Sequence, residues 1–338
     1  MAITKRYGWE IALILLIVLE ILLFGWRNPR LLDINVLLFS TSDFICVGLI
    51  ALPLTMVIVS GGMDISFGST IGLYAISLGI MNQVDIPMII AIPLTLLIDF
   101  ICGLINALLI LYTVVNPLVI TLGTMYLFGG SALLLSGFSG MTGFERIGGF
   151  SMEFTNFANL TVFGLPIPLV IFIVCVIVLW LYMHRIHSGR TVFLIGQNVR
   201  VAQYGAFPVA RILCFLYALL GLSAALASII LVSYFGSARA DLGTSFIMPA
   251  ITAVVLGGAN IYGGSGSILG TALAVLLIGF LQQGLQMVGV PNQISSALSG
   301  ALLIIGVVGR SIYLHRHQIR GWWMRRCNRQ LLSAQQQN

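Results

Sequence analysis

The residues from Leu242 to Gly309 form a run of 68 positions without a single Asp, Glu, Lys or Arg. A helix that crosses a bilayer needs about 20 apolar residues, so this run alone accommodates about three spans. Two further uncharged runs of 20 residues lie at 44–63 and 65–84. Charged residues make up only 8% of the chain, against roughly 25% in soluble domains. The sequence therefore predicts an all-α polytopic membrane protein.

Apolar segments of span length divide the chain into about ten predicted transmembrane helices within one transmembrane domain. The predicted spans are 11–24, 44–60, 66–82, 87–112, 117–137, 167–183, 212–236, 247–262, 267–288 and 293–309. The first six lie within 7–183 and the last four within 212–309. A connection at 184–211 separates the two groups, and a polar tail follows at 310–338.

Charge asymmetry orients these spans. Segments 1–7, 184–211 and 310–338 hold 12 of the 16 Lys and Arg residues and no acid, whereas the opposite loops hold six acids. The positive-inside rule therefore places both termini and the 184–211 connection in the cytoplasm. This distribution accounts for the net charge of +6 without a nucleic-acid partner. All four histidines also lie on that side, so none is expected to relay protons within the membrane.

The 184–211 connection carries four arginines and no acid. Within it, Asn198–Gly205 has the pattern of a short helix that an Asn caps and a Gly ends. We therefore expect a short helix on the cytoplasmic face.

The nine residues 61–69 (GGMDISFGS) align with 257–265 (GGANIYGGS) at an offset of 196, with five identities. Pro53 and Pro249 match at the same offset. Each half of the chain is therefore predicted to contain a span that breaks at a Gly-Gly pair. Freed backbone groups are tolerated in a membrane only where protein buries them or where they line a cavity. The pattern indicates a substrate path at the two breaks, related by either a parallel or an inverted repeat.

One glycine of the first break and several polar residues at span depth are the candidates for this path. They are Gly61, Asp64, Asn116, Thr121, Asn260 and Gln282. Asp64 either caps the amides that begin the next span or contacts substrate or a gate. The uncharged groups suit a small hydroxylated ligand and suit hydrogen bonds between helices equally well. Asp99 lies in mid-span, and the sequence names no partner for it.

Catalytic and cofactor patterns are absent from the sequence. No Ser/His/Asp set or metal-ligand cluster is present, so we expect no enzyme activity, no metal and no cofactor. Residues 264–270 resemble a dinucleotide-binding loop, but they lie within the uncharged run, and close helix packing through Gly266 and Gly270 is the better interpretation. The five cysteines show no CxxC spacing, which favours a packing role.

Four motifs occur in order along the chain: GGMDISFG at 61–68, NPLVITLGT at 116–124, GR…GQN…A from 189 to 202, and LGG…GGSG from 256 to 266. Together they resemble the ribose-type and branched-chain-amino-acid-type permeases of bacterial ABC importers, over nearly the whole chain. Asp99 departs from that pattern, because the family usually has a small or apolar residue there.

The resemblance implies a non-catalytic translocation subunit in the bacterial inner membrane, in contact with membrane lipid. Its implied partners are a second, homologous permease, two copies of a cytoplasmic ATPase and a periplasmic solute-binding protein. The segment 196–205 would be the coupling helix. The residues it implies for ATPase contact are Gly196, Asn198, Val201, Ala202 and Gly205.

The expected cargo is a small polyhydroxylated solute, and the residues do not separate ribose, other monosaccharides and a furanosyl signal molecule. Two other functions remain open at this point. One is a stand-alone proton-coupled transporter that uses Asp64 and Asp99 as proton carriers. The other is a structural or signalling membrane subunit without a path.

Overall fold

The computed structural model describes residues 8–291, apart from 114, 139 and 141–144, and seven positions between 294 and 308. The predicted termini (1–7 and 310–338) and most of the predicted span at 293–309 lie outside the described residues. The described part is almost entirely helical, as predicted.

Six described helices are long and apolar enough to cross a membrane. They are α2 (Gly8–Arg27), α6 (Met88–Tyr112), α7 (Pro117–Phe138), α9 (Ile167–Arg185), α12 (Val209–Phe235) and α14 (Ile268–Met287). A seventh span results if the segment Ile34–Asp43, which consists of α3 (Ile34–Ser40) and the short helix that follows it, is taken as one span with α4 (Ile45–Val59). The two parts meet at a bend of 62°. The polytopic all-α architecture is confirmed, and the count of ten spans stays a prediction.

The remaining elements are short. Two helices, α5 (Phe67–Gln83) and α13 (Ile247–Leu256), correspond to predicted spans, and α10 (His187–Gln197) and α11 (Val199–Tyr204) form the connection after α9. The other elements are η1 (Pro29–Leu32), η2 (Thr41–Asp43), α8 (Met152–Asn156), η3 (Phe157–Asn159), β1 (Thr161–Val162), β2 (Leu165–Pro166) and η4 (Thr244–Phe246). The two strands pair as an antiparallel hairpin.

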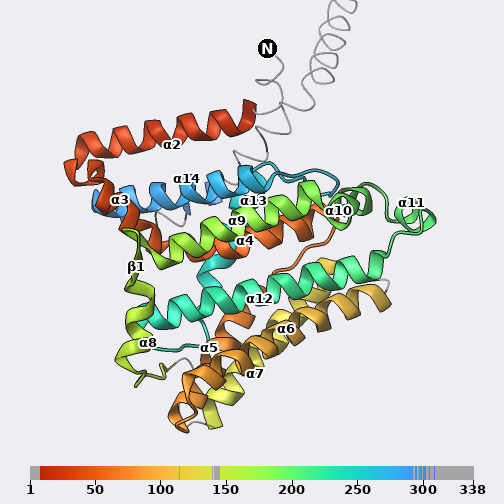
Figure 1. Cartoon of the computed structure of the whole chain (residues 1–338), viewed down its shortest axis with the longest axis horizontal. Coiled ribbons are helices and arrows are strands. Elements are labelled where there is room, and N and C mark those ends of the chain that lie inside the picture. Colours follow the sequence, from red (N-terminus) through yellow and green to blue (C-terminus); the bar gives the residue numbers. More distant parts are fainter. Residues whose placement is uncertain are drawn as a thin grey trace, which may run out of the picture.

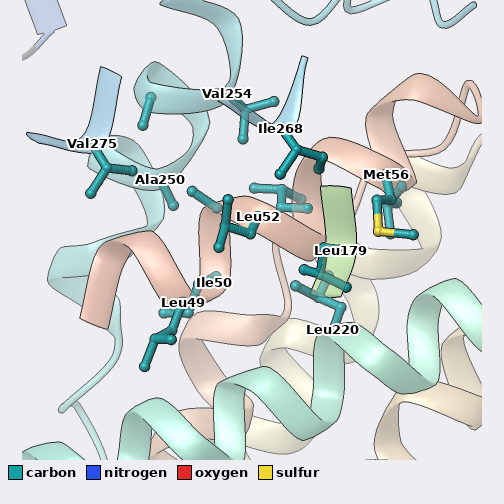
Figure 2. Close-up of a cluster of buried hydrophobic side chains, with 14 of the residues drawn as sticks. Leu49, Ile50, Leu52, Met56, Leu179, Leu220, Ala250, Val254, Ile268 and Val275 are labelled. Atoms are coloured by element: carbon teal, nitrogen blue, oxygen red, sulfur yellow. The ribbon is translucent and has the colours of Figure 1, made fainter. Parts of the chain in front are cut away.

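The centre of the fold is α4, which is buried at all 15 of its residues. A helix that is apolar on every side has no polar face to present to water and becomes the core. Figure 2 shows leucines of α4 packed against side chains of neighbouring helices, among them Leu220 of α12 and Val254 of α13. The Thr55 and Thr271 hydroxyls hydrogen-bond at 2.8 Å and link α4 to α14. Helices from both halves of the chain therefore share one core.

The outer helices expose apolar residues instead. Leu15 and Leu22 on α2, Leu97 on α6 and Leu134 on α7 are all exposed. An exposed surface of this composition suits lipid rather than water. The chain is therefore a multi-pass membrane protein whose outer helices face the bilayer.

The connection between α12 and α13 turns back along α5. Ala238, Ala240 and Gly243 lie against Gly79, Gly72 and Gly68 of α5 in turn, so the chain retraces about 16 Å of helix before α13 begins. A Cβ at Gly72 would collide with the Ala240 carbonyl, which explains the glycine. With only 10 residues, α13 is about 15 Å long, half of a span. The sequence predicted neither the return of the chain nor the half-length helix.

The two ends of the molecule carry different segments. Figure 1 shows α10 and α11 at one end, with α3, α8 and β1 at the other. The 27 residues of α12 cover about 40 Å between these ends. This separation agrees with the predicted assignment of the 184–211 connection and the 138–166 loop to opposite sides of the membrane.

Candidate functional site: the two helix breaks and the α10–α11 connection

The two predicted helix breaks lie against each other. The amide of Gly264, in the second break, donates to the carbonyl of Val59, the last residue of α4, at 2.8 Å. Gly61 and Gly263 have φ values of 84° and 86°, in the left-handed region where glycine is favoured. A Cβ at Gly263 would lie 2.9 Å from the Gly61 Cα. The repeat detected in the sequence therefore marks two segments in direct backbone contact.

The end of α10 completes this contact through Gly196. A Cβ at Gly196 would collide with the Val59 carbonyl of the first break and the Gly264 amide of the second. The Gly196 carbonyl is in turn 2.9 Å from where a Cβ of Gly263 would lie. We call Gly61, Gly196, Gly263 and Gly264 the glycine junction. Because this contact involves no side chains, the backbone of α10 lies directly against both breaks.

Asp64 holds the first break in shape. Its Oδ1 accepts hydrogen bonds from the amide and the hydroxyl of Ser66, both at 2.7 Å. Its Oδ2 accepts from Nδ2 of Asn106 on α6 at 3.1 Å, and the same nitrogen donates to the Ser66 hydroxyl at 2.7 Å. Asp64 is only 3% exposed. Asp64 therefore closes the turn that precedes α5, whose N-cap is Ser66 and not Asp64, and a role of Asp64 in transport stays a prediction. Asn106 joins α6 to the first break.

The second break has the same local turn and additional support. The Asn260 side chain, at the position aligned with Asp64, accepts from the Tyr262 amide at 3.2 Å. From α2, the Trp9 indole donates to the Leu256 carbonyl at 2.7 Å, and the Ser267 hydroxyl donates to Glu10 at 3.1 Å. Sequence reasoning missed Trp9 and Glu10, because their partners lie about 250 residues away and no local pattern marks them.

The other path candidates are dispersed. Thr121 of α7 donates to the Met63 carbonyl at 3.4 Å and so lies beside the first break. Asn116 is exposed and caps the start of α7 by accepting from the Leu118 amide at 2.9 Å. Gln282 lies on α14, about 21 Å along the helix from its start. The structure therefore brings Gly61, Asp64, Thr121 and the Asn260 turn to the breaks, and leaves Asn116 and Gln282 apart.

The predicted short helix is present as α11. Asn198 caps it by accepting from the amides of Arg200 and Val201 at 3.0 and 3.3 Å, and Gly205 follows its last residue. Val201 is 62% exposed and Tyr204 is 89% exposed, whereas Ala202 is 1% exposed and packs into the core. The α11 helix is thus anchored through one small residue and presents bulky apolar side chains outward. Tyr204 was not among the predicted residues, although an aromatic residue in a short polar segment was a usable signal.

The five candidate coupling residues divide by exposure. Asn198, Val201 and Gly205 lie on the exposed surface of the connection, while Gly196 and Ala202 face the rest of the chain. The arginines of the connection are all exposed as well: Arg185, Arg190, Arg200 and Arg211. The connection therefore exposes both basic and apolar side chains, a combination that suits docking of a protein surface that carries acidic residues.

Asp99 lies apart from both breaks, fully buried in α6, and its carboxyl oxygens have no hydrogen-bond partner among the described residues. Burying an unpaired carboxyl group costs several kcal/mol. Asp99→Leu removes both unpaired oxygens, and we therefore expect it to raise the midpoint of thermal unfolding by about 2–4 °C and to leave uptake intact. Thermal unfolding in detergent and uptake in vesicles check both results. Loss of uptake in a stably assembled variant would contradict this account and assign the carboxyl a part in transport.

Comparison with known proteins identifies the class. The family of branched-chain amino acid transport system permease components matches residues 36–307, and the chain belongs to this family. It is 75% identical over 333 residues to the autoinducer 2 import system permease protein LsrD of Photorhabdus temperata, covering 98% of this chain and all of that one. It is 76% identical over 328 residues to the protein of the same name in Yersinia enterocolitica, covering 97% and 99%. No solved structure matches the chain.

Proposed function

We propose that the chain is the membrane-spanning subunit of an ATP-driven importer in the bacterial inner membrane, with both termini in the cytoplasm. The observation that carries this proposal is the series of contacts that leads from the exposed helix α11 to both broken spans. The exposed face of α11 is one residue away from α10, and Gly196 near the end of α10 contacts both breaks. Membership of a permease family supports the same interpretation.

The proposed partners supply the functions for which this chain has no motif. The sequence contains no nucleotide-binding motif, so ATP hydrolysis falls to a separate cytoplasmic ATPase that docks on α11. A second permease, homologous to this chain, completes the translocation unit, and a periplasmic binding protein delivers the solute. The heterodimer of permeases is part of the proposal.

The proposed mechanism uses the breaks as hinges. Movement of the ATPase shifts α11 and α10, and Gly196 passes that shift to the ends of α4 and α13 together. The two halves of the chain then rock about the Gly61 and Gly257 breaks and expose the path to one side at a time. The ATPase drives this exchange because it binds the two arrangements with different free energies.

The proposed cargo is autoinducer-2, a small polyhydroxylated solute. The support is the near-full-length identity to permeases named for autoinducer 2 import. Ribose or another monosaccharide is the alternative cargo. A stand-alone proton-coupled transporter is less well supported, since the Asp64 carboxylate already accepts hydrogen bonds from Ser66 and Asn106.

Val201→Asp on α11 tests the docking role. An acidic residue in place of this exposed apolar side chain is expected to lower uptake of labelled autoinducer-2 at least tenfold and to prevent co-purification of the ATPase. The permease itself is expected to fold, because Val201 is exposed. Val162→Asp, at an exposed valine of β1 at the opposite end of the molecule, is the matched control. Normal ATPase binding by Val201→Asp would refute docking through this helix.

A further inference from the structure

A polar pocket lies at the end of the molecule opposite α11. It has a volume of about 400 Å³ and is formed where α12 ends and the chain turns back toward α13. Its polar lining consists of Arg146, Ser237, Arg239, Asp241, Thr244 and Ser245. Pockets of about 300–1,000 Å³ are the usual size for small-molecule sites. By the charge asymmetry of the loops, this pocket opens on the outer side of the membrane.

Two arginines from distant parts of the chain line this pocket. Ile147 and Ala238 form an isolated antiparallel bridge, with hydrogen bonds of 2.9 and 2.8 Å. Arg146 precedes Ile147 and Arg239 follows Ala238, so the bridge brings both arginines to the same pocket. A guanidinium group carries five N–H donors and no acceptor, so an oxygen-rich ligand in the pocket would accept hydrogen bonds from both arginines.

A carboxylate holds one of the arginines in a fixed position. Arg239 donates from Nε to Asp241 Oδ1 at 2.9 Å and also from Nη2 to Oδ2 at 2.6 Å. Thr244 donates to the Asp241 carbonyl at 2.8 Å and holds the turn that carries this pair. A bidentate pair has a defined orientation, so the remaining N–H groups of Arg239 also have defined directions. The pocket thus combines oriented donors, a carboxylate acceptor and several hydroxyl groups.

The segment that lines the pocket leads through α13 to the second helix break. The segment from Ser237 to Phe246 lines the pocket and lies along α5, and α13 follows directly and ends at Leu256. The second break begins there and forms part of the glycine junction. Contacts made in the pocket therefore act on the same half-helix that the cytoplasmic connection reaches from the other end.

We propose that this pocket is a solute-binding site on the outer face of the permease. It takes a small polyhydroxylated molecule whose oxygens accept hydrogen bonds from Arg146 and Arg239 and whose hydroxyl groups donate to Asp241. This inference rests on the proposed function and adds to it a place where the cargo first contacts this chain. It gives Arg239 a role in recognition and Asp241 the role of orienting it.

Protection of a cysteine in the pocket tests the proposal. Ser245→Cys is introduced into the complete importer in membrane vesicles, and its reaction with a membrane-impermeant maleimide is followed with and without autoinducer-2 or D-ribose. One of these solutes is expected to slow labelling at least fivefold. Thr161→Cys, an exposed position outside the pocket, is expected to react at the same rate with and without solute.

A second variant assigns the effect to the arginine. Adding Arg239→Gln to Ser245→Cys is expected to raise the solute concentration that gives half-maximal protection at least tenfold. Arg30→Gln, at an exposed arginine outside the pocket, is expected to leave it unchanged. Equal protection of the Ser245→Cys and Thr161→Cys variants, or protection by the binding protein without solute, would overturn the site and indicate a protein-docking surface.

Uptake by the same vesicles separates this proposal from the proposed function. Vesicles that import labelled autoinducer-2 and show no protection of the Ser245→Cys variant would overturn the pocket alone. Vesicles that import neither solute would overturn the proposed function, and protection by D-ribose in those vesicles would still support the pocket.

Discussion

Gly196→Ala is expected to abolish uptake, with a loss of at least a hundredfold, in an importer that still assembles. A Cβ at this position collides with two backbone atoms, the Val59 carbonyl and the Gly264 amide, and backbone atoms cannot turn aside as a flexible side chain can. The end of α10 must therefore move away from at least one break. Uptake in vesicles and ATP hydrolysis by the complex are the two measurements, and hydrolysis is expected to persist without transport.

Gly123→Ala is the matched control for this variant. Gly123 also lies in a helix, and no heavy atom lies within 4 Å of the position that its Cβ would take. Its uptake is expected to equal that of the unchanged protein. If Gly196→Ala transports normally, the glycine junction does not connect α10 to the breaks. If it loses both transport and assembly, Gly196 serves folding rather than coupling.

Asp64→Ala is expected to cause the largest loss of stability. The change leaves the Ser66 amide, the Ser66 hydroxyl and one Asn106 bond without their acceptor, in a buried site. Each buried polar group left unsatisfied costs about 1–3 kcal/mol. We expect a fall in the midpoint of thermal unfolding and a lower yield of assembled importer, and uptake should fall in proportion to that yield.

Two comparison variants define what Asp64 does. Asp64→Asn keeps one acceptor oxygen and is expected to recover most of the stability. Asp33→Ala removes an exposed cap, whose side chain accepts from the Asn35 amide at 2.9 Å, and should cost only about 1 kcal/mol. Full stability with lost uptake in Asp64→Asn would show that the charge of Asp64 takes part in transport, contrary to the structural account.

Local patterns predicted the parts of the site that depend on neighbouring residues. The Asn198 cap and Gly205 stop of α11, and the turn at Asp64, each involve contacts within four residues. Such contacts follow from side-chain chemistry and backbone preference alone. The aligned breaks at Gly61 and Gly257 were also visible, because repetition at a constant offset needs no knowledge of the fold.

Contacts between distant segments were not predictable in this way. Nothing near Gly196 in the chain indicates that it lies against Val59 and Gly264, and nothing near Trp9 points to Leu256. The return of the chain along α5 depends on Gly72 meeting Ala240, which are 168 positions apart. Glycine is enriched at close contacts between membrane helices in general, so its presence alone did not identify the partner.

By itself the sequence determined that this chain enters a membrane, which of its connections carries the positive charge, and where its helices break. Those properties depend on hydrophobic length, charge distribution and local backbone preference, all of which are additive along the chain. Only the tertiary structure decided that the two breaks touch, that α10 ends against both, and that Arg146 and Arg239 line one pocket. These pairings depend on how the apolar helices pack around α4. Many arrangements of such helices bury nearly the same hydrophobic area, and close contacts between residues far apart in the sequence select one of them.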